Sequence, residues 1–247
     1  MILSKKHNFI FIKGMKVAGT SVEMALSILC GPEDIITPIS QVDELERLKL
    51  GGRCQNYSAS REAEGKYLER LRAAPPDQIG QVPEPAKRYF SHISLGAAAL
   101  LYGGDISGFR IVCVERSPYA KVISWANMQL SYDNYSRGGT MQADPKALKA
   151  AVDKGLASGE IRHARNIERY RGADGTVIAR PMRYAQLAAD FGDFVRSLGE
   201  DVPVLPHAKK GLMSDRLDPR KVFRPDQIAR INALFADEFT TFGYETV

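Results

Sequence analysis

Short, uninterrupted apolar runs alternate with segments of helical periodicity along most of this 247-residue chain. The apolar runs are Asn8–Lys13, Tyr89–Ser94, Phe109–Glu115, Thr176–Arg180 and Val202–Pro206. Continuous runs of this length are typical of strands buried on both faces of a parallel sheet. Helices placed between such strands give an α/β layer architecture. The sequence therefore predicts one α/β domain over residues 1–247, with a central parallel sheet flanked by helices.

The predicted helices are bounded by glycine and proline. Helical periodicity covers four segments: Ser21–Cys30, Tyr119–Tyr132, Tyr184–Leu198 and Pro225–Phe242. Gly31 should end the first of these helices and Gly199 the third, because glycine commonly follows the last helical residue.

Two polar excursions, residues 41–88 and 133–160, interrupt this pattern. The first holds 17 charged side chains, four prolines and only two aromatic residues, so it is too polar to form a second core. Helices are expected over Val42–Leu50 and Arg61–Ala73. Two interpretations stay open for the excursions: they cover the acceptor site, or they are solvated inserts without a function.

Charge and cysteine content narrow the class of protein. The 34 Lys and Arg residues exceed the 29 Asp and Glu residues, which gives a net charge of +5 and suits an anionic ligand. Three cysteines without CxxC spacing favour a reducing compartment over a disulfide framework or a cysteine zinc site. Apolar runs are too short for a signal peptide or a membrane span, so a cytoplasmic location is expected.

The first motif lies between the strand at Asn8–Lys13 and the helix that follows it. Gly14 and Gly19 have the spacing of a nucleotide-binding P-loop, yet Thr20 and Ser21 stand where that loop has lysine and a hydroxyl residue. A lysine, Lys16, lies inside the loop instead. Amides at a helix N-terminus can bind a phosphate, so the loop predicts a phosphate site.

A structural role for the same residues stays open. Thr20 and Glu23 have capping-box spacing, so the hydroxyl would cap the helix and Glu23 would return to the cap. No apolar strand ends in the aspartate that would hold Mg²⁺, and metal-dependent phosphoryl transfer is therefore disfavoured.

The second motif follows the strand at Phe109–Glu115. Ser117 and Pro118 specify a helix start, which places Arg116 at the carboxyl end of a strand, where open α/β sheets bind ligands. Ser124 lies about two turns along the same helix face. An arginine fork and a hydroxyl suit a phosphate monoester, although an arginine at a strand end also commonly forms a surface ion pair.

Together, the two motifs resemble those of PAPS-dependent sulfotransferases, in the branch that includes the Golgi-type carbohydrate enzymes. The segment Lys16–Ser21 resembles their 5′-phosphosulfate loop, and Arg116–Ser124 resembles their 3′-phosphate motif. Leu205–Gly211 and Phe242–Tyr244 are similar to late elements of the branch. The resemblance spans most of the chain except the two excursions, and it implies a P-loop-like sulfotransferase fold.

The resemblance assigns roles to individual residues. Lys16 matches the lysine on the sulfuryl bridge oxygen, and Arg116 with Ser124 matches the 3′-phosphate clamp. The 5′-phosphate cradle is matched by Val17, Ala18, Gly19, Thr20 and Ser21. The basic loop that closes over the nucleotide is matched by Lys209, Lys210 and Gly211. The chain departs from the family at Met15, which replaces a proline, and at Lys121, which replaces a phosphate-contacting arginine.

The implied reaction moves a sulfuryl group from PAPS to an acceptor hydroxyl, with a carbohydrate as the favoured acceptor and without a metal ion. An alcohol acceptor needs a base. His92, at the end of the predicted strand Tyr89–Ser94, resembles the histidine base of uronyl 2-O-sulfotransferases; a structural role is its alternative. Glu23 is the second candidate base, because some related families use a glutamate. His207 is expected to order the basic loop.

Two other functions stay open. One is a P-loop-type kinase that uses a nucleoside triphosphate. The other is a non-enzymatic nucleotide-binding module. Nucleic acid is not an expected partner, because the basic residues are dispersed and a single tryptophan offers no platform for stacked bases.

Overall fold

The computed structural model describes residues 1–136, 145–206 and 218–247. The chain divides into two compact units, each assembled from separate stretches of sequence. The sheet unit comprises Met1–Gly14, Ala18–Val114 and Glu168–Ala208. The helical unit comprises Met15–Val17, Glu115–Ile167 and Lys209–Val247. The single domain expected over residues 1–247 stays a prediction.

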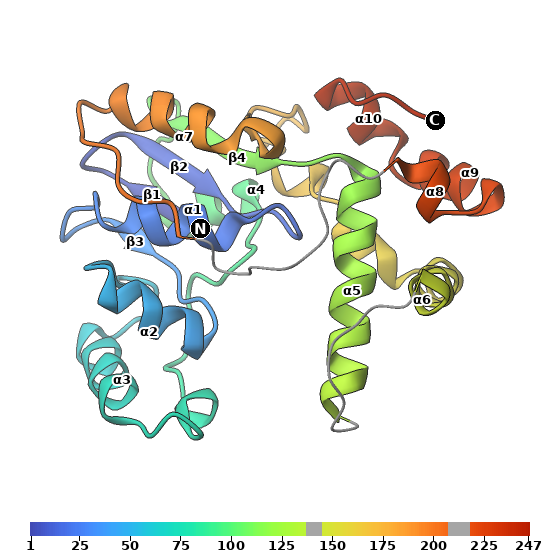
Figure 1. Cartoon of the computed structure of the whole chain (residues 1–247). Helices are drawn as coiled ribbons and strands as arrows, with labels where there is room; N and C mark the ends of the chain where they lie inside the picture. Colours follow the sequence, from blue (N-terminus) through green and yellow to red (C-terminus); the bar gives the residue numbers. More distant parts are fainter. Residues whose placement is uncertain (137–144, 207–217) are drawn as a thin grey trace. The chain divides into compact units, whose positions relative to one another are not determined.

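The sheet unit is built on an open, mixed sheet of five strands in the order β3-β1-β2-β4-β5 (Figure 1). The strands are β1 Ile2–Ser4, β2 Phe9–Ile12, β3 Ile35–Ile36, β4 Arg110–Glu115 and β5 Arg180–Arg183. β2 and β4 are parallel, whereas β1 is antiparallel to both β2 and β3. The expectation of a parallel sheet is therefore correct for the β2–β4 pair and wrong for β1 and β3. The four residues between β1 and β2 allow only a hairpin, since a parallel connection needs a long crossover.

Two of the predicted strands do not form. Tyr89–Ser94 is irregular and turns at residues 91–92, because His92 has a φ of 64°, which no strand accommodates. Val202–Pro206 has no regular structure, and Val204 is 79% exposed, so its apolar side chain contributes nothing to a core. The strand expected at Thr176–Arg180 is displaced, since β5 begins at Arg180. The runs that do form strands, β2 and the end of β4, are completely buried.

Helices flank the sheet within the sheet unit. They are α1 Gly19–Ser27, α2 Gln41–Lys49, α3 Arg61–Ala73, α4 Leu95–Tyr102 and α7 Leu187–Arg196, with 3-10 turns at Ile79–Gln81 and Tyr184–Gln186. An edge-to-face contact between Phe9 and Phe194, with ring centres 5.4 Å apart, holds α7 on β2. In the excursion 41–88, Tyr67 and Leu71 of α3 are buried. Its role as a cover stays a prediction.

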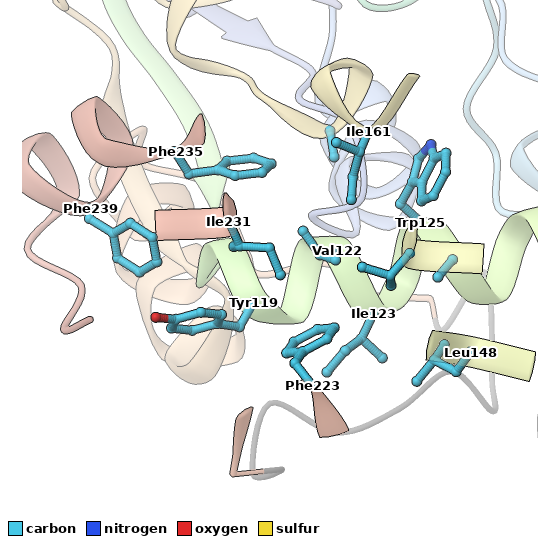
Figure 2. Close-up of a cluster of buried hydrophobic side chains, with 13 residues drawn as sticks. Tyr119, Val122, Ile123, Trp125, Leu148, Ile161, Phe223, Ile231, Phe235 and Phe239 are labelled. Atoms are coloured by element: carbon cyan, nitrogen blue, oxygen red, sulfur yellow. The ribbon is translucent and has the colours of Figure 1, made fainter. Parts of the chain in front are cut away.

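The helical unit packs around α5, Pro118–Ser136 (Figure 2). Its other elements are α6 Pro145–Ser158, α8 Pro219–Val222, α9 Pro225–Leu234, α10 Ala236–Phe242 and a 3-10 turn at Glu160–Ala164. One end of the core is filled by three aromatic residues: Tyr119 of α5, Phe223, which follows α8, and Phe239 of α10. At the other end, a side chain on Gly155 would meet the Trp125 ring at 2.2 Å, so only glycine lets α6 approach α5.

Among the described helices, none is both long and apolar enough to cross a lipid bilayer.

Candidate functional site

The segment between β2 and α1 has the backbone shape of an anion-binding loop. Lys16 and Ala18 have φ values of 64° and 61°, in the left-handed region that non-glycine residues rarely adopt. α1 begins at Gly19 with Ala18 as its N-cap, and no side chain of the described residues caps this end. Left-handed residues next to a helix start direct backbone N–H groups toward an anion.

Gly19 is required by a close approach in this loop. A Cβ atom at Gly19 would lie 2.8 Å from Cγ of Lys13, the residue that follows β2. The glycine therefore lets α1 start directly against the Lys13 side chain. Of the two hydroxyl residues in the first turn, Thr20 is half-buried and Ser21 is buried.

The capping box predicted at Thr20 and Glu23 is wrong. Glu23 is completely buried, and its carboxylate lies 3.0 Å from Lys13 Nζ and accepts hydrogen bonds from Thr37 and from the Met1 ammonium. Arg47 Nη2 is 3.9 Å away. Burial raises the pKa of Glu23, but these cations outweigh burial and hold the pKa well below its usual range. A carboxylate so enclosed and so acidic is a poor candidate for a catalytic base.

His92 is oriented by the end of β2. Its Nδ1 is 3.1 Å from the carbonyl oxygen of Lys13, and a carbonyl can only accept, so Nδ1 carries the proton. Nε2 is then the basic nitrogen, and it has no hydrogen-bond partner in the described part of the chain. Burial, followed by the charge of Lys13, lowers the pKa of His92 to about 4. The imidazole is therefore neutral at physiological pH.

Arg116 and Lys16 lie together in the helical unit. Arg116 is buried at the end of β4, and its Nη1 donates to the backbone oxygen of Lys16 at 3.5 Å. The Lys16 ammonium lies 3.3 Å from the Met128 sulfur, which is a weak acceptor. The unit that holds both residues contains 16 Lys and Arg against 11 Asp and Glu, whereas the sheet unit contains 18 of each. The entire net charge of +5 thus belongs to the helical unit.

The other predicted clamp residues have different environments. Ser124 is buried on α5. Lys121 is completely buried, with its Nζ 2.6 Å from both Glu115 and Glu238. Lys209, Lys210 and Gly211, and also His207, lie outside the described residues.

Sequence reasoning missed two features. Asn166 is completely buried, and its side chain bonds both the backbone N–H and the backbone oxygen of Met15. A cavity of about 500 Å³ in the sheet unit is lined by Ala18 and Ser21, by the 3-10 turn Tyr184–Gln186, by the start of α7 and by Leu205 and Pro206. No sequence pattern predicts the role of Asn166, because its partner Met15 lies 151 residues away. The aromatic Tyr184 at a predicted helix start is the single cue to the cavity.

The described residues contain no group of three or more His, Cys, Asp or Glu side chains that could hold a metal ion. Compared with protein-family models, with curated proteins and with solved structures, the chain matches none of them.

Proposed function

We propose that this chain is a sulfotransferase that moves a sulfuryl group from PAPS to an acceptor hydroxyl, with a carbohydrate as the favoured acceptor. One observation carries the proposal: Arg116 Nη1 donates to the oxygen of Lys16, 100 residues away in sequence. Either motif alone would suit any phosphate. The contact makes the two motifs neighbours, which supports a ligand that has two phosphate groups, as PAPS has at its 3′ and 5′ positions.

The loop supports a role for the 5′-phosphosulfate. The positive-φ residues Lys16 and Ala18, the uncapped start of α1 and the close approach at Gly19 all suit a phosphate next to the backbone. We assign the 3′-phosphate to Arg116 and Ser124, and closure over the nucleotide to Lys209, Lys210 and Gly211.

The proposed chemistry is in-line transfer. The acceptor oxygen attacks sulfur while the bond from sulfur to the 5′-phosphate oxygen breaks, which yields a sulfate ester and adenosine 3′,5′-bisphosphate. Negative charge builds on the departing oxygen, where the Lys16 ammonium and the loop amides would stabilise it. A sulfuryl group carries less charge than a phosphoryl group, so these donors can act without a metal ion.

His92 is the proposed base. Its Nδ1–H is fixed by Lys13, the last residue before the loop, which leaves Nε2 to take the proton of the acceptor hydroxyl. Because its pKa is lowered to about 4, the imidazole is already neutral and needs no prior deprotonation.

The test is transfer of labelled sulfate from PAPS to a panel of acceptors that includes sugars, lipids and small alcohols. We expect a labelled sulfate ester, formed equally well in excess chelator. A parallel assay with labelled ATP examines the kinase alternative. Label from ATP, or loss of transfer in chelator, would contradict the proposal.

A His92→Ala variant tests the base. It should abolish transfer to an alcohol and leave the affinity for adenosine 3′,5′-bisphosphate nearly unchanged. His7→Ala is a matched control, because His7 contacts Leu29 and Glu200 and has no assigned role. A His92→Ala variant that retains its activity would remove the histidine from the mechanism.

A further inference from the structure

We infer that Asn166 is a positioning residue, which holds the loop that carries Lys16 in the shape needed for transfer. The inference rests on the proposed function, since it is there that Lys16 receives its role. Asn166 lies between the 3-10 turns Glu160–Ala164 and Ile167–Arg169 and has no solvent exposure. Its side chain faces Met15, the residue before Lys16.

The contact is a two-point clamp on the backbone. Asn166 Oδ1 accepts from the Met15 N–H at 2.6 Å, and Asn166 Nδ2 donates to the Met15 oxygen at 3.1 Å. Only a carboxamide offers a donor and an acceptor side by side in this way. The clamp fixes both peptide groups of Met15. The next residue, Lys16, then keeps a left-handed conformation that persists only when its surroundings hold it.

Asn166 is itself held by a closed ring of four buried residues. Its backbone N–H donates to Glu238 Oε1 at 2.5 Å, and Glu238 Oε2 accepts from Lys121 Nζ at 2.6 Å. Lys121 Nζ lies 2.6 Å from Glu115 Oε1, and Glu115 Oε2 accepts from Asn166 Nδ2 at 3.5 Å. Because every member contacts the next, Asn166 has little freedom to move.

The same ring reaches the second motif. Glu115 Oε1 accepts from the backbone N–H of Arg116 at 2.8 Å, and the Arg116 side chain donates to the Lys16 oxygen. Burying two carboxylates and one lysine is a poor way to gain stability. The ring does, however, fix the main chain beside both proposed phosphate contacts. We therefore assign it to the alignment of Lys16 and Arg116.

A double-mutant cycle tests whether Asn166 acts through Lys16. Asn166→Ala should lower kcat by about tenfold or more, because misplacing one catalytic group is costly. In a Lys16→Ala background the same change should have no further effect. Losses that multiply would overturn the inference. Val152→Ala, which truncates a buried core residue of the same unit away from the loop, is the control for lowered stability and should retain turnover.

Hydrogen exchange tests the clamp without relying on activity. The Met15 amide should be protected in the wild-type protein, exchange about tenfold faster or more in Asn166→Ala, and stay protected in Val152→Ala. Unchanged exchange in Asn166→Ala would overturn the clamp, however active the enzyme. A wild-type protein that neither binds adenosine 3′,5′-bisphosphate nor transfers sulfate would instead defeat the proposed function, and exchange at Met15 would still decide the clamp.

Discussion

Each unit buries an ion network, and the two networks have opposite charge balance. In the sheet unit, Glu23 faces Lys13, Arg47 and the Met1 amino group, and Arg47 also pairs with Glu44. In the helical unit, one ammonium, Lys121, lies between Glu115 and Glu238. Burial therefore has different consequences for the pKa of a carboxylate in the two networks.

Burial raises the pKa of Glu23 and of Glu115, and the charged groups around each carboxylate decide the direction of the final shift. At Glu23 the charge of Lys13, followed by those of Met1 and Arg47, reverses the effect, and the pKa is held well below its usual range. At Glu115 the nearby Glu238 adds to burial, Lys121 opposes them both, and the pKa is raised. The charges that surround a buried carboxylate, rather than its burial alone, therefore determine how much stability is lost when the carboxylate is removed.

The largest effect should come from removing one carboxylate from each network. Glu23→Gln should lower the free energy of unfolding by about 3–5 kcal/mol, because buried cations lose their partner. Glu115→Gln should cost much less, since one lysine then faces one carboxylate. Urea unfolding at pH 7 measures both. Equal losses of unfolding free energy in the two variants would contradict the difference inferred between the two networks.

The two lysines that flank the start of the loop should separate stability from catalysis. Lys16→Ala should lower turnover by roughly 100- to 1,000-fold, the scale for losing one donor to a developing charge. Its effect on affinity for adenosine 3′,5′-bisphosphate should be smaller, since that product lacks the sulfuryl group. Lys13→Ala should instead lower the melting temperature, because Glu23 loses its partner. If product affinity falls as far as turnover, Lys16 is a phosphate anchor only.

A smaller effect is expected at Arg116, the proposed contact of the 3′-phosphate. Adenosine 3′,5′-bisphosphate should raise the melting temperature by linkage, and AMP, which lacks the 3′-phosphate, should raise it much less. Arg116→Ala should remove most of that discrimination, since a charge-assisted hydrogen bond contributes about 1.5–3 kcal/mol. Equal stabilisation of the wild-type protein by both nucleotides would contradict the assignment of Arg116.

The smallest effect should be that of pH on the proposed base. His92 has its pKa lowered from 6.5 to about 4, so the rate should change little between neutral pH and about pH 5.5 and fall only near pH 4. Between these two pKa values the unfolded chain binds a proton that the folded chain does not, so stability should decline as pH falls through this window. A pH–rate profile with its midpoint near 6.5 would place His92 in a more solvated setting.

Local signals in the sequence predict part of this structure well. Helix α5 begins at Pro118 as its Ser-Pro start indicates, and α3 covers the expected residues. The strands β1 and β3 are only three and two residues long, which is too short for a pattern to be recognised. Tyr89–Ser94 has strand composition, but His92 adopts a positive φ and bonds to Lys13 instead.

Long-range contacts explain why the candidate site was less predictable. The spacing of Thr20 and Glu23 fits a local cap, but partners brought in from Met1, Lys13 and Arg47 take the Glu23 carboxylate. The Thr20 hydroxyl does not cap α1, because the helix starts two residues earlier than expected, with Ala18 as its N-cap. A motif of neighbouring residues cannot reveal such competitors.

The packing of Trp125 against Gly155 has a spectroscopic consequence. Trp125 is the single tryptophan of the chain, it is 2% exposed, and it belongs to the helical unit. Its emission, excited at wavelengths that tyrosine does not absorb, therefore reports one unit alone, while the sheet unit contributes to far-ultraviolet circular dichroism. Denaturation curves that coincide for the two signals would show that both units melt in one cooperative step, and separated curves would reveal which unit opens first.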